Sequence, residues 1–539
     1  MTPFTFNFDS RNSPWPGTDF IDSKDSTVRV MFQGNPASPK HSSWRLSIEL
    51  LKQEYPDSII SYLDYDGKSP VVADCSPADH YHSLSFRDSV RSSKSANALS
   101  AGTRFFASKE YEELRFIALK LLNRNDLTGT FRLLEREVIL QATVLKNLEI
   151  LSTAAPNLLV FRVTPHQFMP YVTQQVANWL LIPTLFFQPV SICQGVIPRL
   201  DLDKHMTGII STNQVEAERG LLQQQCRVNL ERLQDKQDPK YMISHKNRDL
   251  KARLPLTRLL ALRYNVKWMF KDRYPNSVDF SGHTRTVSIF WRFFKIFITR
   301  SLQNSLSDKI SLTHGTHNFN SYAVFALHYE PERTSLPEGF PVTFQADAVV
   351  AARDLLPEDT QLLVKEHYSQ ASLAWRGFTG RSPWFYDLVE SYPNTSWLRS
   401  SSSLVMEIAN SVCVFTLTGT IALEAMFLGV PVVYFGCPWW AGAPGTMRFS
   451  ASLNITDIES FKPASEKEIY TFFSDLAKET ILPGTGSENL ATIESRLGRL
   501  SAEFFSAEAS GVVAAIRAAL TPHTPADLQA NEAPSHPQY

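Results

Sequence analysis

Two segments far apart in this chain follow the same order of strand, polar turn, helix and strand. The opening strands are at 158–163 and 412–417, and the turns that follow them are at 164–167 and 418–420. In the second segment, Gly429 ends the helix ahead of the next strand. Such units lay parallel strands side by side and cover them with helices. The sequence therefore predicts an α/β fold with two similar halves.

The length of the chain indicates more than one domain. At 539 residues it exceeds what a single hydrophobic core supports. The expected organisation is a loose lead-in at 1–26, an N-terminal Rossmann-like domain with helical insertions at 27–315, a C-terminal Rossmann-like domain at 316–485, a closing helix at 486–520 and a disordered tail at 521–539. Two Rossmann-like domains facing each other across a cleft describe the GT-B architecture, which is the fold we expect.

Composition narrows the class of protein. A hydrophobic content of 43% with 12% aromatic residues is typical of a well-packed globular enzyme. The net charge of −1 argues against a general nucleic-acid-binding protein. The five cysteines are scattered without a CxxC spacing, so we expect reduced thiols and neither a disulfide framework nor a zinc site. No metal site is predicted.

The sequence favours a cytoplasmic location. The first residues lack the basic start and apolar run of a signal peptide, and no uninterrupted apolar stretch is long enough to span a bilayer. The segment 288–300 alternates aromatic residues with Arg292, Lys295 and Arg300. We interpret it as a core helix with snorkelling basic residues. The alternative is a helix on a membrane surface, which would bring the protein to the inner face of the membrane.

Polar residues stand where the predicted strands end. The polar tips are 33–35 and 164–167 in the first half, and 328–332, 365–367 and 418–420 in the second half. Ligands of doubly wound folds bind at the carboxyl ends of the strands, so the tips are the candidate binding residues.

The turn Thr418-Gly419-Thr420 is a candidate phosphate site. Small residues ahead of a helix let an anion approach free N–H groups and the positive end of the helix dipole. Glu424 lies one turn into that helix and misses the capping-box position by one residue, so we predict that it binds ribose hydroxyls. The alternative is that Thr420 merely caps a core helix.

The other tips in the second half carry groups for acid-base chemistry and charge neutralisation. Glu330 and Glu332 can act as base, nucleophile or hydroxyl acceptor, and the alternative for either is an ion pair with a nearby cation such as Arg333. Lys365 and His367 can neutralise a departing phosphate without a metal ion. A structural hydrogen bond is the alternative for His367.

Two further histidines and two tryptophans complete the set of candidates. His328 lies at the same tip as the carboxylates, and His166 in the first half is placed to touch an acceptor or to serve as base. Trp439 and Trp440 can stack on a sugar or, alternatively, anchor their loop in the core.

The order of these motifs resembles a known family. The segments HYEPE, PEGF, LLVKEH, FYDLVESYPN, LTGTIALEA and VPVVYFG, spread over 322–449, resemble the capsule-polysaccharide biosynthesis family of GT-B proteins, which includes bacterial β-Kdo transferases. The resemblance implies transfer of a sugar from a nucleotide-activated donor, typically CMP-linked, to a surface glycan. Those enzymes show Gln-Pro and His-Pro motifs, where this chain has Glu330-Pro331 and His367-Tyr368.

We therefore expect a metal-independent glycosyltransferase without a cofactor, whose substrates are a nucleotide sugar and a glycan or glycolipid acceptor. The N-terminal domain would bind the acceptor and the C-terminal domain the donor. One alternative is a nucleotide-sugar epimerase of the same fold, which needs no acceptor. Another is a non-catalytic carbohydrate-binding or assembly subunit.

Overall fold

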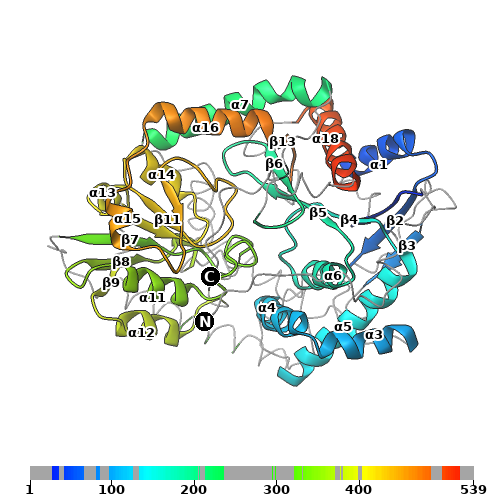
Figure 1. Cartoon of the computed structure of the whole chain (residues 1–539), viewed down its shortest axis with the longest axis horizontal. Helices are drawn as coiled ribbons and strands as arrows, with labels where there is room; N and C mark the ends of the chain where they lie inside the picture. Colours follow the sequence, from blue (N-terminus) through cyan, green and yellow to red (C-terminus); the bar gives the residue numbers. More distant parts are fainter. Residues whose placement is uncertain are drawn as a thin grey trace.

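The structure is a computed structural model of the chain, shown in Figure 1. It describes residues 27–34, 42–65, 80–84, 96–125, 133–203, 206, 213–235, 294, 298, 301, 321–330, 332–370, 377, 380–398, 404–486 and 500–521. The predicted lead-in at 1–26, nearly all of the predicted tail and nearly all of the helix expected at 288–300 lie outside the described residues.

The first half of the chain builds a mainly parallel sheet. In the described part of the chain its strand order is β13-β6-β5-β4-β1-β2-β3, with β6 antiparallel to both of its neighbours. The strands are β1 (Arg29–Gln33), β2 (Ile59–Asp64), β3 (His80–Ser83), β4 (Leu158–Phe161), β5 (Thr184–Pro189), β6 (Gly195–Arg199) and β13 (Leu482–Pro483). The side chains of its central strands are buried on both faces, as the apolar runs predict, whereas His80 on the edge strand β3 is exposed.

Helices cover both faces of this sheet. They are α1 (Ser42–Glu54), α3 (Ala96–Phe106), α4 (Lys109–Asn125), α5 (Leu133–Ala154), α6 (Phe168–Trp179), α7 (Asn213–Gln234) and α18 (Ala502–Leu520). One core joins the sheet to α3, α4, α5 and α6, and the core on the opposite face joins it to α1 and α18.

The second half builds a second sheet, which is parallel throughout its described strands. Their order is β12-β11-β10-β7-β8-β9. The strands are β7 (Tyr322–Ala326), β8 (Gln361–Lys365), β9 (Thr395–Leu398), β10 (Val414–Thr416), β11 (Val432–Tyr434) and β12 (Thr446–Arg448). The helices are α11 (Gln345–Leu355), α12 (Pro383–Ser391), α13 (Leu404–Ala409), α14 (Ile421–Phe427), α15 (Ile455–Glu459) and α16 (Glu466–Glu479), with a 3-10 turn at Tyr368–Gln370. The α11 and α12 helices pack on one face, and α13, α14 and α16 on the other.

Both sheets have the strand order of the doubly wound fold. Counted from the first strand of each half, the first six strands lie in the order 3-2-1-4-5-6. The direction of winding therefore reverses between β1 and β4 in one sheet and between β7 and β10 in the other. The predicted α/β fold with two Rossmann-like domains is confirmed, and Figure 1 shows the two domains side by side.

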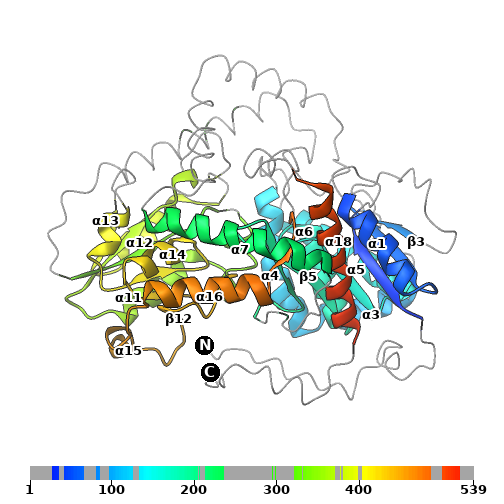
Figure 2. The ribbon, with the colours of Figure 1, turned by 90° about the horizontal axis from the view of Figure 1, so that it is seen from above.

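The chain returns to the first domain near its end. β13 pairs with β6 of the N-terminal sheet, and α18 packs against α1. The predicted boundary at residue 485 therefore falls just after a strand of the other sheet. Helix α7 contacts α14 and α16 of the second domain as well as α18 and β13 of the first, and Figure 2 shows it extending from one domain to the other. Helix α7, from the helical insertions predicted within 27–315, therefore bridges the two domains.

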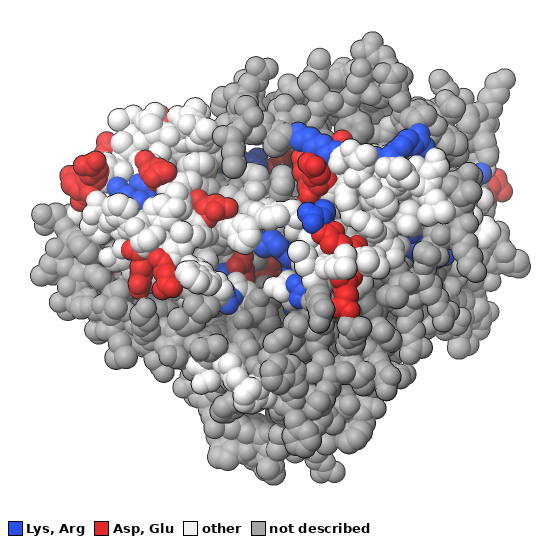
Figure 3. Space-filling model, turned by 90° about the horizontal axis from the view of Figure 1, so that it is seen from below, with Lys and Arg blue, Asp and Glu red and all other residues white. Residues whose placement is uncertain are grey.

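The described surface offers no strong charge of one sign on the face drawn in Figure 3. Acidic and basic side chains are interspersed there, in keeping with the net charge of −1. Among the helices of the described residues, none is both long and apolar enough to cross a membrane.

Candidate functional site

The segments that follow β4 and β7 meet where the two domains touch. The Thr164 hydroxyl donates a 2.8 Å hydrogen bond to Oε1 of Glu338, and both residues are buried. Nε of Arg333 lies 3.1 Å from the same Glu338 oxygen. We call the contact between residues 164–167 and 328–340 the tip junction. Because β4 and β7 each border the switch point of their sheet, the tip junction brings two ligand-binding edges face to face.

His166 lies at the tip junction, on the N-terminal side. Its Nδ1 is 2.8 Å from the carbonyl oxygen of Thr164, and Nη1 of Arg124 donates a 3.1 Å hydrogen bond to the His166 carbonyl oxygen. Burial, together with the guanidinium groups of Arg124 and Arg333, lowers the pKa of His166 to about 3. The imidazole is therefore neutral at pH 7. Its bond to Thr164 assigns the proton to Nδ1 and leaves Nε2 as a proton acceptor.

Glu332 lies at the same junction, on the C-terminal side. Its side chain is exposed, and the Thr334 hydroxyl donates a 3.1 Å hydrogen bond to Oε2. Although the residue reaches solvent, the protein packed around its carboxyl group partly desolvates it and raises the pKa of Glu332, while Arg333 and Arg124 act in the opposite direction. Solvent thus reaches a carboxyl group that holds its proton more tightly than usual, which suits proton transfer. Glu332 and His166, which come from opposite domains, share Arg124 and Arg333 as charged neighbours.

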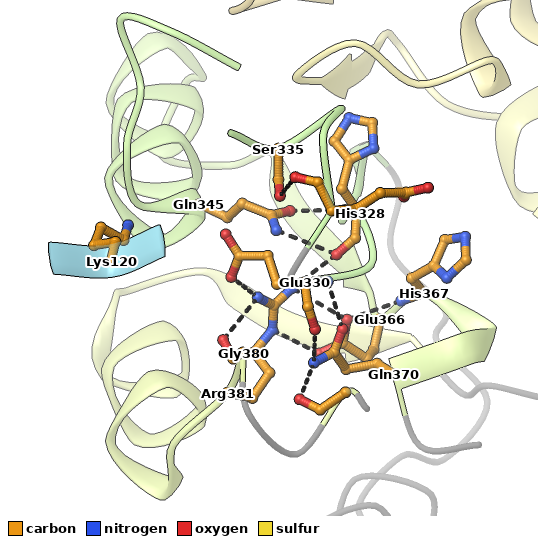
Figure 4. A network of polar contacts seen from close by, with 12 residues as sticks. Lys120, His328, Glu330, Ser335, Gln345, Glu366, His367, Gln370, Gly380 and Arg381 are labelled. Carbon is orange, nitrogen blue, oxygen red and sulfur yellow. Dashed lines mark hydrogen bonds and ion pairs between the residues drawn. The ribbon is translucent and has the colours of Figure 1, made fainter. Parts of the chain in front are cut away.

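Glu330, the second predicted carboxylate, is paired with a buried arginine (Figure 4). Its Oε2 forms an ion pair with Nη1 of Arg381, and Nε of Arg381 lies 3.1 Å from Oε2 of Glu366. Nη2 of Arg381 donates a 3.0 Å hydrogen bond to the carbonyl oxygen of His328. Burial opposes the charge of Arg381, but the Glu366 and Glu330 carboxylates outweigh it and raise the pKa of the guanidinium. Glu330 therefore has the ion pair that the sequence left open as an alternative.

The backbone of Glu330 is fixed as well. Its N–H donates to the Gln370 side chain at 2.9 Å, and its carbonyl oxygen accepts from that amide at 3.0 Å. Gly380 packs so closely that a Cβ there would lie 2.4 Å from the Glu330 carbonyl carbon. These contacts hold the tip after β7 in one conformation.

His328 connects that tip to the turn after β10. The Thr418 N–H donates a 2.8 Å hydrogen bond to Nε2 of His328, and the backbone of His328 is held by Gln345 at 2.7 Å and 3.2 Å. Burial lowers the pKa of His328 to about 3, with His367 and Arg381 acting in the same direction. The buried, neutral imidazole therefore positions the predicted phosphate turn.

The predicted phosphate turn uses several of its own polar groups within the protein. The Thr418 hydroxyl donates to the carbonyl oxygen of Thr334 at 2.8 Å, and the Gly419 N–H donates to the Thr416 hydroxyl at 3.2 Å. A phosphate would have to replace these bonds to use the same groups. Thr420 occupies the N-cap position of α14, but its side chain makes no capping hydrogen bond. The position of Thr420 thus agrees with the capping alternative, but its side chain does not serve as the cap.

The remaining donor-side candidates lie around the same sheet edge. Lys365 is half-buried at the end of β8, and burial lowers its pKa to about 8 against the opposing effect of Glu407. The His367 ring lies 6.1 Å from the Tyr329 ring at the tip after β7, between centroids. Glu424 is half-buried in the first turn of α14. Their predicted roles in binding remain predictions.

Trp439 and Trp440 are anchors of their loop. Trp439 is 5% exposed and packs against Phe473, while Trp440 is fully buried against Tyr434. Stacking on a sugar would need an open ring face, so the sugar-stacking prediction is wrong.

Further contacts join the domains on either side of the tip junction. Nζ of Lys120 on α4 donates to the carbonyl oxygen of Thr343 and lies 3.5 Å from the centroid of the Phe344 ring. Asp203 pairs with Arg448 at 2.8 Å. In the described part of the chain, no three His, Cys, Asp or Glu side chains are grouped to hold a metal ion.

Sequence reasoning missed the arginines of this site. Arg381 and Arg124 stand outside the predicted tips, and Arg333 was weighed as a partner for Glu332. The segments HYEPE, PEGF and VKEH carry more carboxylates than basic residues. Because buried carboxylates require cations, this excess could have indicated that arginines from elsewhere in the chain reach the site.

Comparisons with known proteins give weak similarities. No family model and no curated protein matches the chain. Among solved structures, it is similar to a beta Kdo 2,7 transferase, KpsC of Thermosulfurimonas dismutans, with 13% identity over 33% of this chain and 53% of that chain and a TM-score of 0.22. The chain thus spans about half the length of that transferase.

Two other similar structures cover more of the chain. The UDP-GlcNAc 2-epimerase of Neisseria meningitidis, solved with UDP-GlcNAc, is 11% identical over 87% of this chain and 99% of that chain, with a TM-score of 0.19. A family 9 glycosyl transferase of Veillonella parvula is 10% identical over 84% of this chain and 97% of that chain, also with a TM-score of 0.19. At such scores the fold assignment rests on the strand order alone.

Proposed function

We propose that this protein is a metal-independent glycosyltransferase. It would move a sugar from a nucleotide-activated donor to a surface or capsular polysaccharide precursor, which is a glycan or glycolipid. The observation that carries the proposal is the tip junction, where Thr164 of one Rossmann-like domain contacts Glu338 of the other. His166 and Glu332 belong to the two sides of this junction and share Arg124 and Arg333 as charged neighbours. A transferase that joins two substrates needs such groups between two binding edges.

The donor would lie on the C-terminal domain. Thr418, Gly419 and Thr420 would surround its phosphate, and Glu424 would bind the ribose. Lys365 and His367 would neutralise the charge that develops on the departing phosphate. His328 and Glu330 would act indirectly, because the first holds Thr418 and the second is paired with Arg381.

Transfer requires that the acceptor hydroxyl lose its proton as the sugar moves. His166 would accept that proton at Nε2, the acceptor oxygen would bond to the anomeric carbon, and the bond between sugar and phosphate would break. The nucleotide would leave with the bonding electrons. Glu332 would position the acceptor or relay the proton to solvent, which reaches its side chain.

The resemblance in the motifs suggests a CMP-linked donor. We would measure thermal midpoints with CMP, CDP, UDP and GDP, with and without Mg²⁺. A ligand that binds the folded state raises the midpoint once its concentration exceeds Kd. We expect a shift with one nucleotide, unchanged by Mg²⁺ and lost in Lys365→Ala/Thr420→Ala. The matched control is Thr103→Ala/Lys467→Ala, which changes two exposed residues elsewhere.

The outcomes separate the alternatives. A shift with CMP supports a Kdo-like donor. A shift with UDP, followed by release of an altered UDP-sugar without any acceptor, would identify an epimerase instead. No shift with any nucleotide at millimolar concentration would contradict the proposal and favour a non-catalytic subunit.

A further inference from the structure

Two arginines approach the turn that carries His166, one from each domain. Arg124, in the last turn of α4, donates a 3.1 Å hydrogen bond to the His166 carbonyl oxygen. Arg333 reaches the same turn through Glu338, which is 3.1 Å from its Nε and accepts the 2.8 Å hydrogen bond from Thr164. A continuous chain of contacts therefore connects both guanidinium groups to one short segment.

Two acidic groups of the described residues lie near this segment. Glu338 is 3% exposed and already has two partners, Thr164 and Arg333. Glu332, the other carboxyl group within reach of both arginines, has a raised pKa because of burial. Both arginines act on the imidazole of His166 as positive neighbours. These two positive neighbours favour an anion as a charged ligand at this turn.

Arg333 retains donors for such an anion. In the described part of the chain its Nε is buried without a hydrogen-bond partner, although it lies 3.1 Å from its ion-pair partner Glu338, and the side chain is 21% exposed. A guanidinium group presents its N–H donors as a planar fork that matches the oxygens of a carboxylate or a phosphate. Glu338 is the ion-pair partner of this guanidinium group and lies beside its Nε.

We propose that Arg333 and Arg124 form an oxyanion subsite on the acceptor side of the tip junction. It would bind a carboxylate or phosphate group of the acceptor, so that the acceptor is an anionic glycan or glycolipid. This inference rests on the proposed function, because it assigns an acceptor to His166. The location supports the acceptor rather than the donor, since the arginines converge on the N-terminal domain's turn and the predicted phosphate turn belongs to the other domain.

The subsite would also prepare His166 for its role. The two positive charges disfavour protonation of the imidazole in the free protein. A bound anion would offset both charges and raise the pKa of His166, although burial, the largest cause of the low pKa, would remain. The acceptor would thus make the base stronger where its own hydroxyl must be deprotonated.

The test measures binding of simple anions to the full chain. The probes are inorganic phosphate for the phosphate source and glucuronate for the carboxylate source, with glucose and matched chloride as references. Affinities are measured by calorimetry for the wild type, Arg333→Gln, Arg124→Gln and the conservative Arg333→Lys. The control is Arg227→Gln, on the exposed face of α7. The nucleotide identified in the panel above is titrated in parallel.

We expect at least one anion to bind the wild type and Arg227→Gln. The affinity should fall at least tenfold in Arg333→Gln and Arg124→Gln, and less in Arg333→Lys, with nucleotide affinity unchanged throughout. The anion that binds more tightly, phosphate or glucuronate, then identifies the acidic group of the acceptor as a phosphate or a carboxylate. If Arg333→Gln does not fold, Arg333→Lys and Arg124→Gln carry the test, since both still predict weaker anion binding.

Other results overturn the inference separately from the function. Nucleotide binding without any response to phosphate or glucuronate would refute the subsite and leave the transferase proposal standing. Equal loss of nucleotide and anion affinity in Arg333→Gln would assign the arginine to the donor and also refute the subsite. Anion binding that depends on both arginines, with no nucleotide binding at all, would support the subsite and refute the proposed donor chemistry.

Discussion

Protonation of His328 should make the stability of the protein depend on pH. The side chain is 7% exposed, and its Nε2 accepts a hydrogen bond from the Thr418 N–H, which a protonated ring cannot do. The pKa of His328 is about 3 in the folded protein, with burial as the main cause. In the unfolded chain a histidine takes up its proton near pH ~6.5. Stability is therefore present above that pH and is lost as the pH falls toward 3.

The magnitude follows from the number of protons taken up. One proton bound only by the unfolded state costs about 1.4 kcal/mol per pH unit. Between pH ~6.5 and ~5 the His328 contribution to the free energy of unfolding should thus fall by about 2 kcal/mol. His166, whose pKa is lowered to about 3 as well, adds a loss in the same direction.

The assay is urea unfolding at several pH values for the wild type and His328→Gln. Glutamine keeps an oxygen that can accept from Thr418 but does not titrate, so the slope of free energy against pH should fall by about 1.4 kcal/mol per unit. His80→Gln, at an exposed position of β3, controls for the loss of a histidine. Equal slopes in the wild type and His328→Gln would refute the reasoning, because His328 would then titrate alike in both states.

Three further changes test the packing of the site by urea unfolding. Arg381→Met leaves two carboxylates without their buried cation and should lower the free energy of unfolding by about 3–5 kcal/mol. Arg517→Met breaks a partly exposed ion pair and should lower it by about 1 kcal/mol or less. Similar losses in both variants would contradict the buried network. Thr164→Val should cost about 1–3 kcal/mol, since Glu338 loses its hydroxyl donor; an unchanged midpoint would mean that the domains do not meet there. Gly436→Ala should destabilise the protein because its Cβ would lie 2.5 Å from the Glu338 carbonyl oxygen. Gly220→Ala, in open space on α7, should stabilise the protein by about 0.5–1 kcal/mol. A stabilised Gly436→Ala and a destabilised Gly220→Ala would refute this packing.

The fold was predictable because its strands are buried on both faces. Such strands read as short apolar runs, and polar residues mark where they end. The strand predicted at 158–163 is β4 (Leu158–Phe161), and the helix predicted between the turn at 418–420 and Gly429 is α14 (Ile421–Phe427). Gly429 follows that helix with φ of 70°, a conformation that favours glycine. These elements depend on local sequence, which is why the pattern located them.

The partners of the site residues were not predictable in the same way. Glu330 pairs with Arg381, which lies 51 positions later in the sequence. No local pattern indicates which cation reaches a given carboxylate after the sheet has formed. The same holds for β13, a two-residue strand that pairs with β6 from the far end of the chain. Long-range contacts decide whether a polar tip faces a ligand or another part of the protein.

The measurement that tests the account most directly is donor turnover by the wild type and His166→Gln. The assay follows release of nucleotide from the nucleotide sugar that binds best, in the presence of mixed acidic and neutral glycan acceptors. We predict that His166→Gln binds the donor as the wild type does, while turnover falls by about 10²–10⁴-fold because the general base is lost. Turnover that is unchanged in His166→Gln would contradict the role of the tip junction as the catalytic centre.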